Sequence, residues 1–166
     1  MGAVFRARGH VCGNAGAAGD VDPGNRPHRV ATRLGPSVDR TALKVVVKIP
    51  GPDHPIAIEP TGHRVTVRLG ERVIADSDAA LSLAEASYPV VQYLPLADVD
   101  PDVLRPTDTV TTCPYKGDAA YYSIVADDAE LTDAVWTYPT PHDAVAPIAG
   151  HVAFYPDKVQ ITVAGG

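Results

Sequence analysis

Prolines and glycines interrupt this chain so often that short strands and turns are favoured over long helices. The sequence holds 16 prolines and 14 glycines among 166 residues. Proline lacks the N–H that a helix interior needs, and glycine favours turns. A chain of this length predicts one domain with room for a tail.

Alternating apolar residues predict the first strands. Val65, Val67 and Leu69 alternate with polar residues in HRVTVRL, which is the pattern of a half-buried strand, and IAIEP before it alternates in the same way. Gly70 and Glu71 follow and predict a tight turn into the strand RVIAD. The segment therefore predicts a β-hairpin.

One helix is predicted over DAALSLAEAS, residues 78–87. Ser77 would cap it, and Asp78 would lie in its first turn, where a carboxylate is favoured. Leu81 and Leu83 would supply its apolar side. Glu85 would lie near its end, where an acid is normally solvated.

The remaining segments predict further short strands and their connections. VVQYLP is a strand that Pro95 ends, and ADVDPDVLRP is a turn-rich connection. TDTVTTC and AAYYSIV form a hairpin over PYKGD, with Gly117 available for positive φ. LTDAVWTYP is a strand, PHDAVAPIAG is a one-turn helix or loop, and HVAFYPDKVQITV closes as a hairpin over Pro156 and Asp157. Together these patterns predict a mainly β fold, a compact antiparallel barrel-like domain with one short helix over an opening.

Residues 1–46 differ from the rest in composition and charge. They are rich in Gly, Ala and Arg and show no sustained periodicity, which predicts a disordered tail. They carry seven Lys or Arg against three Asp, a net charge of +4, and the remaining residues carry 7 basic against 17 acidic residues, a net charge of −10. Because composition changes near Val47, we expect residues 47–166 to form the single β domain. We also hypothesise that the natural chain starts at Val47, read from a GUG codon.

Charge and hydrophobicity limit the partners and the location. A body of net charge −10 repels a phosphate backbone, so nucleic acid is not expected as a partner. No segment reaches the ~18 apolar residues of a transmembrane helix, and the start lacks the apolar run of a secretory signal, so no membrane contact and a cytoplasmic location are expected. The two cysteines, Cys12 and Cys113, show no disulfide framework. The oligomeric state is left open.

Cys113 and Lys116 are the first candidates for chemistry. A nearby ammonium lowers the pKa of a thiol, so Lys116 would activate Cys113 as a nucleophile or would hold an anionic ligand group. The alternative is that Cys113 is a small buried hydrophobe and Lys116 solvates the turn. No histidine partner for Cys113 can be assigned from the sequence.

Aromatic residues gather in the last 52 residues of the chain. On neighbouring strands alternate residues share a face, so about half of these rings are expected to line one pocket. The alternative is that they fill the core. The residues are Tyr115, Tyr121, Tyr122, Trp136, Tyr138, Phe154 and Tyr155.

Metal chemistry finds little support in the sequence. Asp76 and Asp78 form a D-x-D pair that is suited to Mg²⁺, but a helix cap by Ser77 and Asp78 explains the pair without a metal. No spaced Cys/His set predicts zinc. We therefore expect no metal site and no cofactor.

Several strings of the chain resemble one bacterial and fungal family over residues 47–166. They are VKIPGPDHPI, RVIADS, QYLPLADV, TTCPYKG, AAYYSI, AVWTYP and AVAPIAGHVAFYPDKV. The family is known as domain of unknown function 427 and carries a nucleotidyltransferase label without an assigned mechanism. The resemblance implies a β-tent or Mss4-like fold, although the cysteine pairs that hold zinc in some relatives are absent here. Many members have a basic residue just after the Ala-Asp-Ser turn, where this chain has Asp78.

Carried over by position, the resemblance implies a set of characteristic residues. They are Glu85, Tyr93, Cys113, Lys116, Gly117, Tyr121, Tyr122, Trp136, Tyr138, Pro139, His151, Phe154 and Tyr155.

We therefore expect a domain that binds a small anionic or nucleotide-like molecule in an aromatic-lined pocket. Lys116, Glu85 and His151 would be its polar contacts, and the ligand-binding residues would be Tyr93, Gly117, Tyr121, Tyr122, Trp136, Tyr138, His151 and Tyr155. One alternative is an enzyme in which Cys113 is the nucleophile, or in which Lys116 and Glu85 face a phosphate in nucleotidyl transfer. Another is a non-catalytic interaction module with Trp136 and Tyr138 as surface anchors.

Overall fold

Ten short antiparallel strands build the part of the chain that the computed structural model describes, residues 48–126 and 128–165. The predicted tail and the proposed start at Val47 lie outside these residues. The strands are β1 (Ile56–Pro60), β2 (Val65–Leu69), β3 (Arg72–Ser77), β4 (Leu81–Glu85), β5 (Val91–Pro95), β6 (Leu104–Cys113), β7 (Gly117–Ala126), β8 (Ala129–Thr137), β9 (His151–Phe154) and β10 (Gln160–Val163). Three 3₁₀ turns join them: η1 (Leu96–Asp98), η2 (Pro101–Val103) and η3 (Asp143–Ile148).

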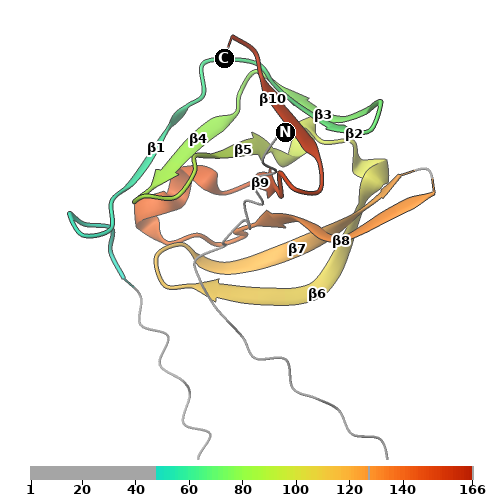
Figure 1. Ribbon diagram of the computed structural model, residues 1–166. Helices are drawn as coiled ribbons and strands as arrows, with labels where there is room; N and C mark the ends of the chain where they lie inside the picture. Colours follow the sequence, from blue (N-terminus) through green and yellow to red (C-terminus); the bar gives the residue numbers. More distant parts are fainter. Residues whose placement is uncertain (1–47, 127, 166) are drawn as a thin grey trace, which may run out of the picture.

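The strands form two sheets, which confirms the mainly antiparallel β prediction. The larger sheet has seven strands in the order β1-β4-β5-β9-β8-β7-β6, and the smaller has the order β10-β2-β3. Figure 1 shows the larger sheet curving around, with β1, β4 and β5 on one side and β6, β7 and β8 on the other. Since β1 and β6 remain its edges, the sheet is rolled but is not a closed barrel.

The predicted helix over residues 78–87 is wrong, because this segment is strand β4. Leu81 pairs with Tyr93 of β5, and Leu83 pairs with Ile58 of β1. Leu81 and Leu83 are two residues apart, so in an extended strand they face the same side, and pairing on both edges outweighs the helical propensity of the alanines. In the described residues the only helical elements are the three 3₁₀ turns.

Ser77 does not cap a helix. It is the last residue of β3, and its hydroxyl donates to Asp98 at 2.6 Å and accepts from the Ala79 backbone N–H at 3.0 Å. The side chain therefore ties the turn after β3 to η1.

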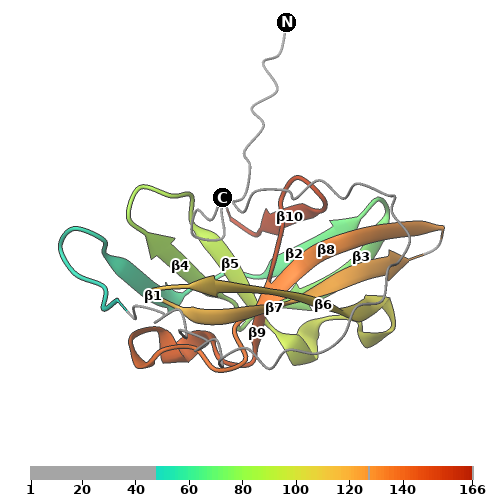
Figure 2. The same ribbon diagram turned by 90° about the horizontal axis from the view of Figure 1, so that it is seen from below.

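The predicted hairpin over Pro156 and Asp157 is also wrong. Strand β9 pairs with β5 and β8 in the larger sheet, whereas β10 pairs with β2 in the smaller one. The turn between them thus carries the chain from one sheet to the other, as Figure 2 shows from below, where β10 lies beside β2 and β3. The hairpins β2–β3 and β6–β7, and the loop or turn at η3, are confirmed.

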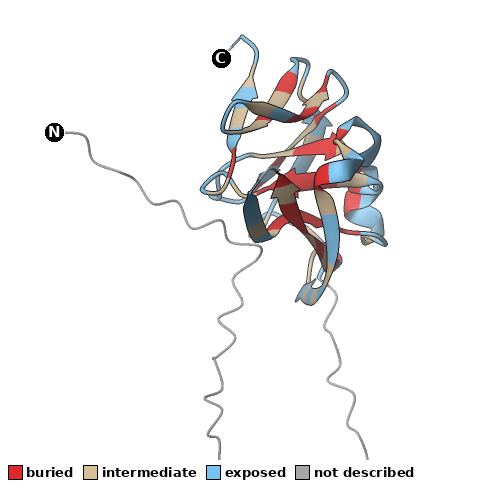
Figure 3. Cartoon of the chain, turned by 90° about the vertical axis from the view of Figure 1, so that its right-hand side faces the viewer, coloured by how far each residue is buried: buried red, intermediate tan, exposed pale blue. Residues whose placement is uncertain are grey.

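The larger sheet is buried on both faces in its central strands, and each face has its own apolar cluster. The intersheet cluster lies between the two sheets and includes Val65, Val67, Ile74, Leu94, Ile124, Val135, Val152 and Phe154. The interior cluster lies on the other face, within the curve of the larger sheet, and comprises Leu83, Tyr93, Cys113, Ala119, Tyr121, Trp136, Tyr138, Val145, Ile148 and Ala153. Figure 3 shows buried stretches along the strands and exposed stretches both at the turns and on parts of some strands.

Alternation along single strands divides residues between the two clusters. On β5, Tyr93 joins the interior cluster and Leu94 the intersheet cluster. On β9, Ala153 faces the interior and Phe154 faces the smaller sheet. Because successive strand side chains point to opposite faces, two buried faces require nearly continuous apolar strands.

Candidate functional site

A buried ion pair lies at the edge of the interior cluster. Lys116 Nζ donates to Glu85 Oε2, and the side chains of the two residues are only 5% and 8% exposed. Glu85 is the last residue of β4, and Lys116 lies in the turn before β7. The rolling of the sheet thus brings together two residues that the sequence analysis singled out separately, and Glu85 is buried, contrary to the expectation of a solvated acid.

The residue that follows each member of this pair has a positive φ angle. Ala86, directly after Glu85, has φ of 46°, which is a strained left-handed conformation for a residue with a side chain. Its N–H donates to the Pro55 carbonyl at 2.8 Å, so β4 stops there and Glu85 is fixed against the segment before β1.

Gly117 holds the other side. It has φ of 104°, as predicted for the turn, and a Cβ at this position would lie 3.2 Å from the Thr140 carbonyl oxygen. The neighbouring Lys116 carbonyl accepts from the His142 N–H at 3.0 Å. Gly117 therefore shapes the turn and permits its close approach to residues 140–142.

His54 completes a three-residue cluster that the sequence analysis did not assign. Its Nε2 lies 2.8 Å from Glu85 Oε1, and its side chain is 22% exposed. A carboxylate only accepts hydrogen bonds, so Nε2 carries the proton. We call Glu85, Lys116 and His54 the polar cluster; it links the buried ammonium to the surface through one shared carboxylate.

Tyr115 covers the outer side of the polar cluster. Its ring stacks on the His54 ring with centroids 4.0 Å apart and planes 7° apart. Lys48 Nζ lies over the Tyr115 ring at 5.6 Å from its centroid, and the exposed Tyr88 lies 6.4 Å from His54 in a tilted arrangement. The polar cluster thus reaches the surface among aromatic rings.

The aromatic grouping predicted from the sequence is largely brought together. Tyr93, Tyr121, Trp136 and Tyr138 are buried in the interior cluster, and Tyr115 and Tyr155 pack against it half-buried. Tyr121 and Trp136 are paired across β7 and β8, which places them side by side. The burial of Trp136 and Tyr138 contradicts their proposed role as surface anchors.

Tyr93 connects the rings to the ion pair. Trp136 Nε1–H donates to the Tyr93 hydroxyl at 3.2 Å. Burial raises the pKa of the Tyr93 phenol to about 12, and the neighbouring Lys116 ammonium acts in the opposite direction. Lys116 Nζ also lies 5.9 Å from the centroid of the Tyr138 ring. Tyr93 therefore stays a neutral hydroxyl within the field of the polar cluster.

Three predicted residues lie elsewhere. Tyr122 and Phe154 pack in the intersheet cluster, on the opposite face of the larger sheet. His151 begins β9, and its Nδ1 contacts the Ala149 carbonyl oxygen at 2.9 Å. His151 is thus engaged with its own turn, whereas His54 occupies the place at Glu85.

Cys113 is buried in the interior cluster. It is 1% exposed and lies opposite Gly117 in the β6–β7 register. Cys113 is one of the neighbouring groups that raise the pKa of the Tyr93 phenol. A nucleophilic thiol must be accessible to its substrate, and the buried thiol of Cys113 is not accessible in this structure.

Asp76 and Asp78 do not form a shared carboxylate site. Asp76 accepts from Arg64 Nε at 2.7 Å and pairs with Arg64 Nη2 as well, and this hydrogen bonding holds the pKa of Asp76 below its usual range. Asp78 is exposed in the turn after β3. Within residues 48–126 and 128–165, no group of three or more His, Cys, Asp or Glu gathers that could hold a metal ion.

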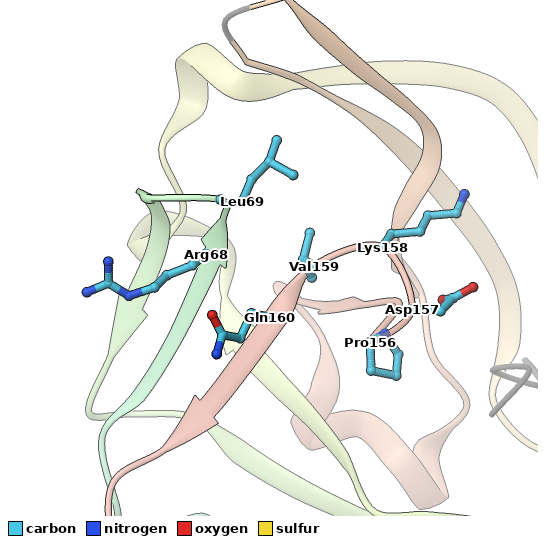
Figure 4. Close-up of a pocket in the computed structure, with 8 residues that line it drawn as sticks. Arg68, Leu69, Pro156, Asp157, Lys158, Val159 and Gln160 are labelled. Carbon is cyan, nitrogen blue, oxygen red and sulfur yellow. The ribbon is translucent and has the colours of Figure 1, made fainter. Parts of the chain in front are cut away.

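An open depression lies away from the polar cluster, at the β2–β3 and β9–β10 turns. It has a volume of about 370 Å³ and is lined by residues 68–70 and 156–160. Figure 4 shows Arg68 and Lys158 pointing away from each other, with Leu69 and Val159 between them. Lys158 Nζ is also bonded to the Thr132 carbonyl, so the two cations do not converge on one anion.

Comparison with known families identifies the chain. Residues 57–165 match the model of a family described as a domain of unknown function (DUF427), whose short name, NTP_transf_9, carries the nucleotidyltransferase label. The chain belongs to this family. The match runs from the second residue of β1 to just beyond β10 and so includes Glu85 and Lys116. No curated protein matches the chain.

None of the described helical turns is long and apolar enough to cross a membrane. The relation of this DUF427 domain to β-tent or Mss4-like folds and its cytoplasmic location remain predictions.

Proposed function

We propose that this DUF427 domain binds a small anionic, nucleotide-like molecule at the end of the rolled sheet where the polar cluster meets the surface. The sharing of Glu85 between a buried ammonium and a partly exposed imidazole is the observation that carries this proposal. Taking charges out of water costs several kcal/mol per ion, so their arrangement beside a strained turn is typical of functional sites.

Each member of the polar cluster has a separate role in the proposal. Lys116 neutralises the buried Glu85 carboxylate, so an anionic ligand would not face an uncompensated negative charge at this place. Glu85 orients both nitrogens, and His54 is the group that a ligand from solvent would meet first. The rings around them supply the apolar lining that small-molecule sites require.

The nucleotidyltransferase label of the family supports a nucleotide-like ligand and leaves the reaction open. Asp76 of the D-x-D pair is bound by Arg64 and lies near the end of β3 in the smaller sheet. We therefore propose binding as the function and assign no transfer step to these residues.

Thermal unfolding with nucleoside monophosphates tests the proposal. A ligand that binds the native state raises the unfolding temperature in proportion to the logarithm of its concentration over Kd. The variant is the double substitution Lys116→Met with Glu85→Gln, which removes the ammonium without leaving an unpaired buried carboxylate. The matched control is Lys158→Met, which removes a lysine from the β9–β10 turn.

We expect the wild type and the Lys158→Met protein to be stabilised equally by at least one monophosphate, and the double variant to lose the effect. If no monophosphate stabilised the wild type, or if the double variant responded as the wild type does, the proposal would be wrong.

A further inference from the structure

We infer that the outer face of the Tyr115 ring is a stacking platform for a planar ring, so the ligand class is an aromatic ring joined to an anionic group. This inference deepens the proposed function and rests on it for the anionic end. The sequence analysis assigned neither His54 nor Lys48 to the site, and it named Tyr115 only among the aromatic residues of which about half were expected to line a pocket.

Tyr115 and His54 form a rigid double layer. Their rings are almost parallel, 7° apart, at a centroid distance of 4.0 Å, which is face-to-face packing. The His54 ring is held by its hydrogen bond to Glu85, and Glu85 is held by Lys116. The platform is therefore fixed in orientation before any ligand arrives, which lowers the cost of binding.

One face of the Tyr115 ring is covered by His54, so the Lys48 ammonium that lies over the ring lies on the other face. Among the described residues the group recorded over that other face is the Lys48 ammonium, 5.6 Å from the ring centroid. Lys48 is exposed, and a lysine stem is flexible, so its ammonium can move aside. A planar ring would take its place against Tyr115.

Lys48 then serves the anionic end of the ligand. A ring stacked on Tyr115 brings its substituents within reach of the displaced ammonium, while Lys116 neutralises the Glu85 carboxylate that lies behind His54. Stacking makes no hydrogen-bond demands on the ring, so this platform favours planar ligands as a class and does not select one base.

Calorimetric titration with three probes tests the inference. Adenosine 5′-monophosphate carries ring and phosphate, ribose 5-phosphate carries the phosphate alone, and adenosine carries the ring alone. The variants are Tyr115→Leu and Tyr115→Phe, and the matched control is Tyr122→Leu, a half-buried tyrosine on the opposite face of the sheet.

We expect adenosine 5′-monophosphate to bind more tightly than either part. Tyr115→Leu should weaken its binding about 5- to 150-fold, which is the range of one base–aromatic stack, and should leave ribose 5-phosphate unchanged. Tyr115→Phe and Tyr122→Leu should bind as the wild type does. A nuclear Overhauser effect between the adenine protons and the Tyr115 ring should be present in the wild type, which keeps the test valid if Tyr115→Leu fails to fold.

Equal binding of adenosine 5′-monophosphate and ribose 5-phosphate would overturn the platform while leaving the proposed function intact. An equal loss for both probes in Tyr115→Leu would also overturn it, because Tyr115 would then support only the fold of the site. Absence of binding by all three probes would overturn the proposed function itself.

Discussion

Lys116 and Glu85 lie 31 positions apart in the sequence and form an ion pair whose side chains are 5% and 8% exposed. The pair closes the end of the rolled sheet, since one partner ends β4 and the other precedes β7. Because the pair is buried, the stability of the fold depends on both partners being present.

Lys116→Met is expected to lower the free energy of unfolding by about 3 kcal/mol, because it leaves the Glu85 carboxylate buried with only His54 to compensate it. Urea denaturation measures the change. Adding Glu85→Leu should restore most of the loss, since an apolar pair of similar volume is often as stable as a buried ion pair. Arg64→Met, which breaks the exposed pair with Asp76, should change the free energy little. A double variant no more stable than Lys116→Met would contradict the prediction.

The Cys113 thiol is expected to react only after unfolding. In a chain that carries Cys12→Ser, so that Cys113 is the one remaining cysteine, a thiol reagent should label the native protein far more slowly than the urea-unfolded protein, because Cys113 is 1% exposed. The rate in native buffer should follow the population of the opened state. Rapid labelling in native buffer would show that the interior opens at Cys113.

The buried Tyr93 phenol predicts a loss of stability at high pH. The unfolded value of its pKa is 10.0, and burial raises the folded value to about 12. The folded state therefore holds the proton more tightly, so the contribution is fully present below pH 10 and is lost as pH rises towards 12, by about 2–3 kcal/mol.

Urea denaturation between pH 9 and about pH 11.5 measures this effect. The Tyr93→Phe protein is the control: the difference in free energy between it and the wild type should be constant below pH 10 and should shift in favour of the variant above that value. A constant difference throughout would mean that Tyr93 ionises equally well in both states.

Ala86→Gly is expected to leave the free energy of unfolding unchanged or to raise it by up to about 1 kcal/mol. Ala86 has φ of 46°, and glycine removes the cost of a side chain in that conformation, which offsets its greater freedom in the unfolded chain. The matched control is Ala84→Gly, also exposed but within β4, which should lower the free energy by about 0.5–1 kcal/mol. Equal losses in the two variants would rule out strain at Ala86.

Local pattern predicted most strands, and it failed where pairing with other strands decided the structure of a segment. The alternation of Val65, Val67 and Leu69 identified β2 because a half-buried strand has an unambiguous period of two. In 78–87 the alanines matched a helix, and only the pairing of β4 with β1 and β5 decided for a strand. Similarly, nothing around Pro156 shows that β9 and β10 join different sheets.

The residues of the candidate site also fall into two groups, those that the sequence indicated and those that only the structure revealed. The sequence strings pointed to Glu85, Lys116 and the tyrosines, and alternation explains why Tyr121 and Trp136 share a face that Tyr122 does not. No spacing in the chain connects His54 to Glu85, and His151 was chosen in its place. A histidine in a turn becomes a partner of a carboxylate only when the sheet curves and brings the turn to it.

The sequence by itself determined the chemistry of the parts: a β-rich domain without long helices, a glycine turn at Gly117, and an aromatic C-terminal half. Only the tertiary structure decided that Lys116 faces a carboxylate within its own domain and that Cys113 is buried. It also decided that the rings of His54 and Tyr115 stack on the outer side of the Lys116–Glu85 pair. The reason is physical. Strand propensity and turn chemistry act over a few residues, whereas the partner of a buried charge is set by how the sheet rolls.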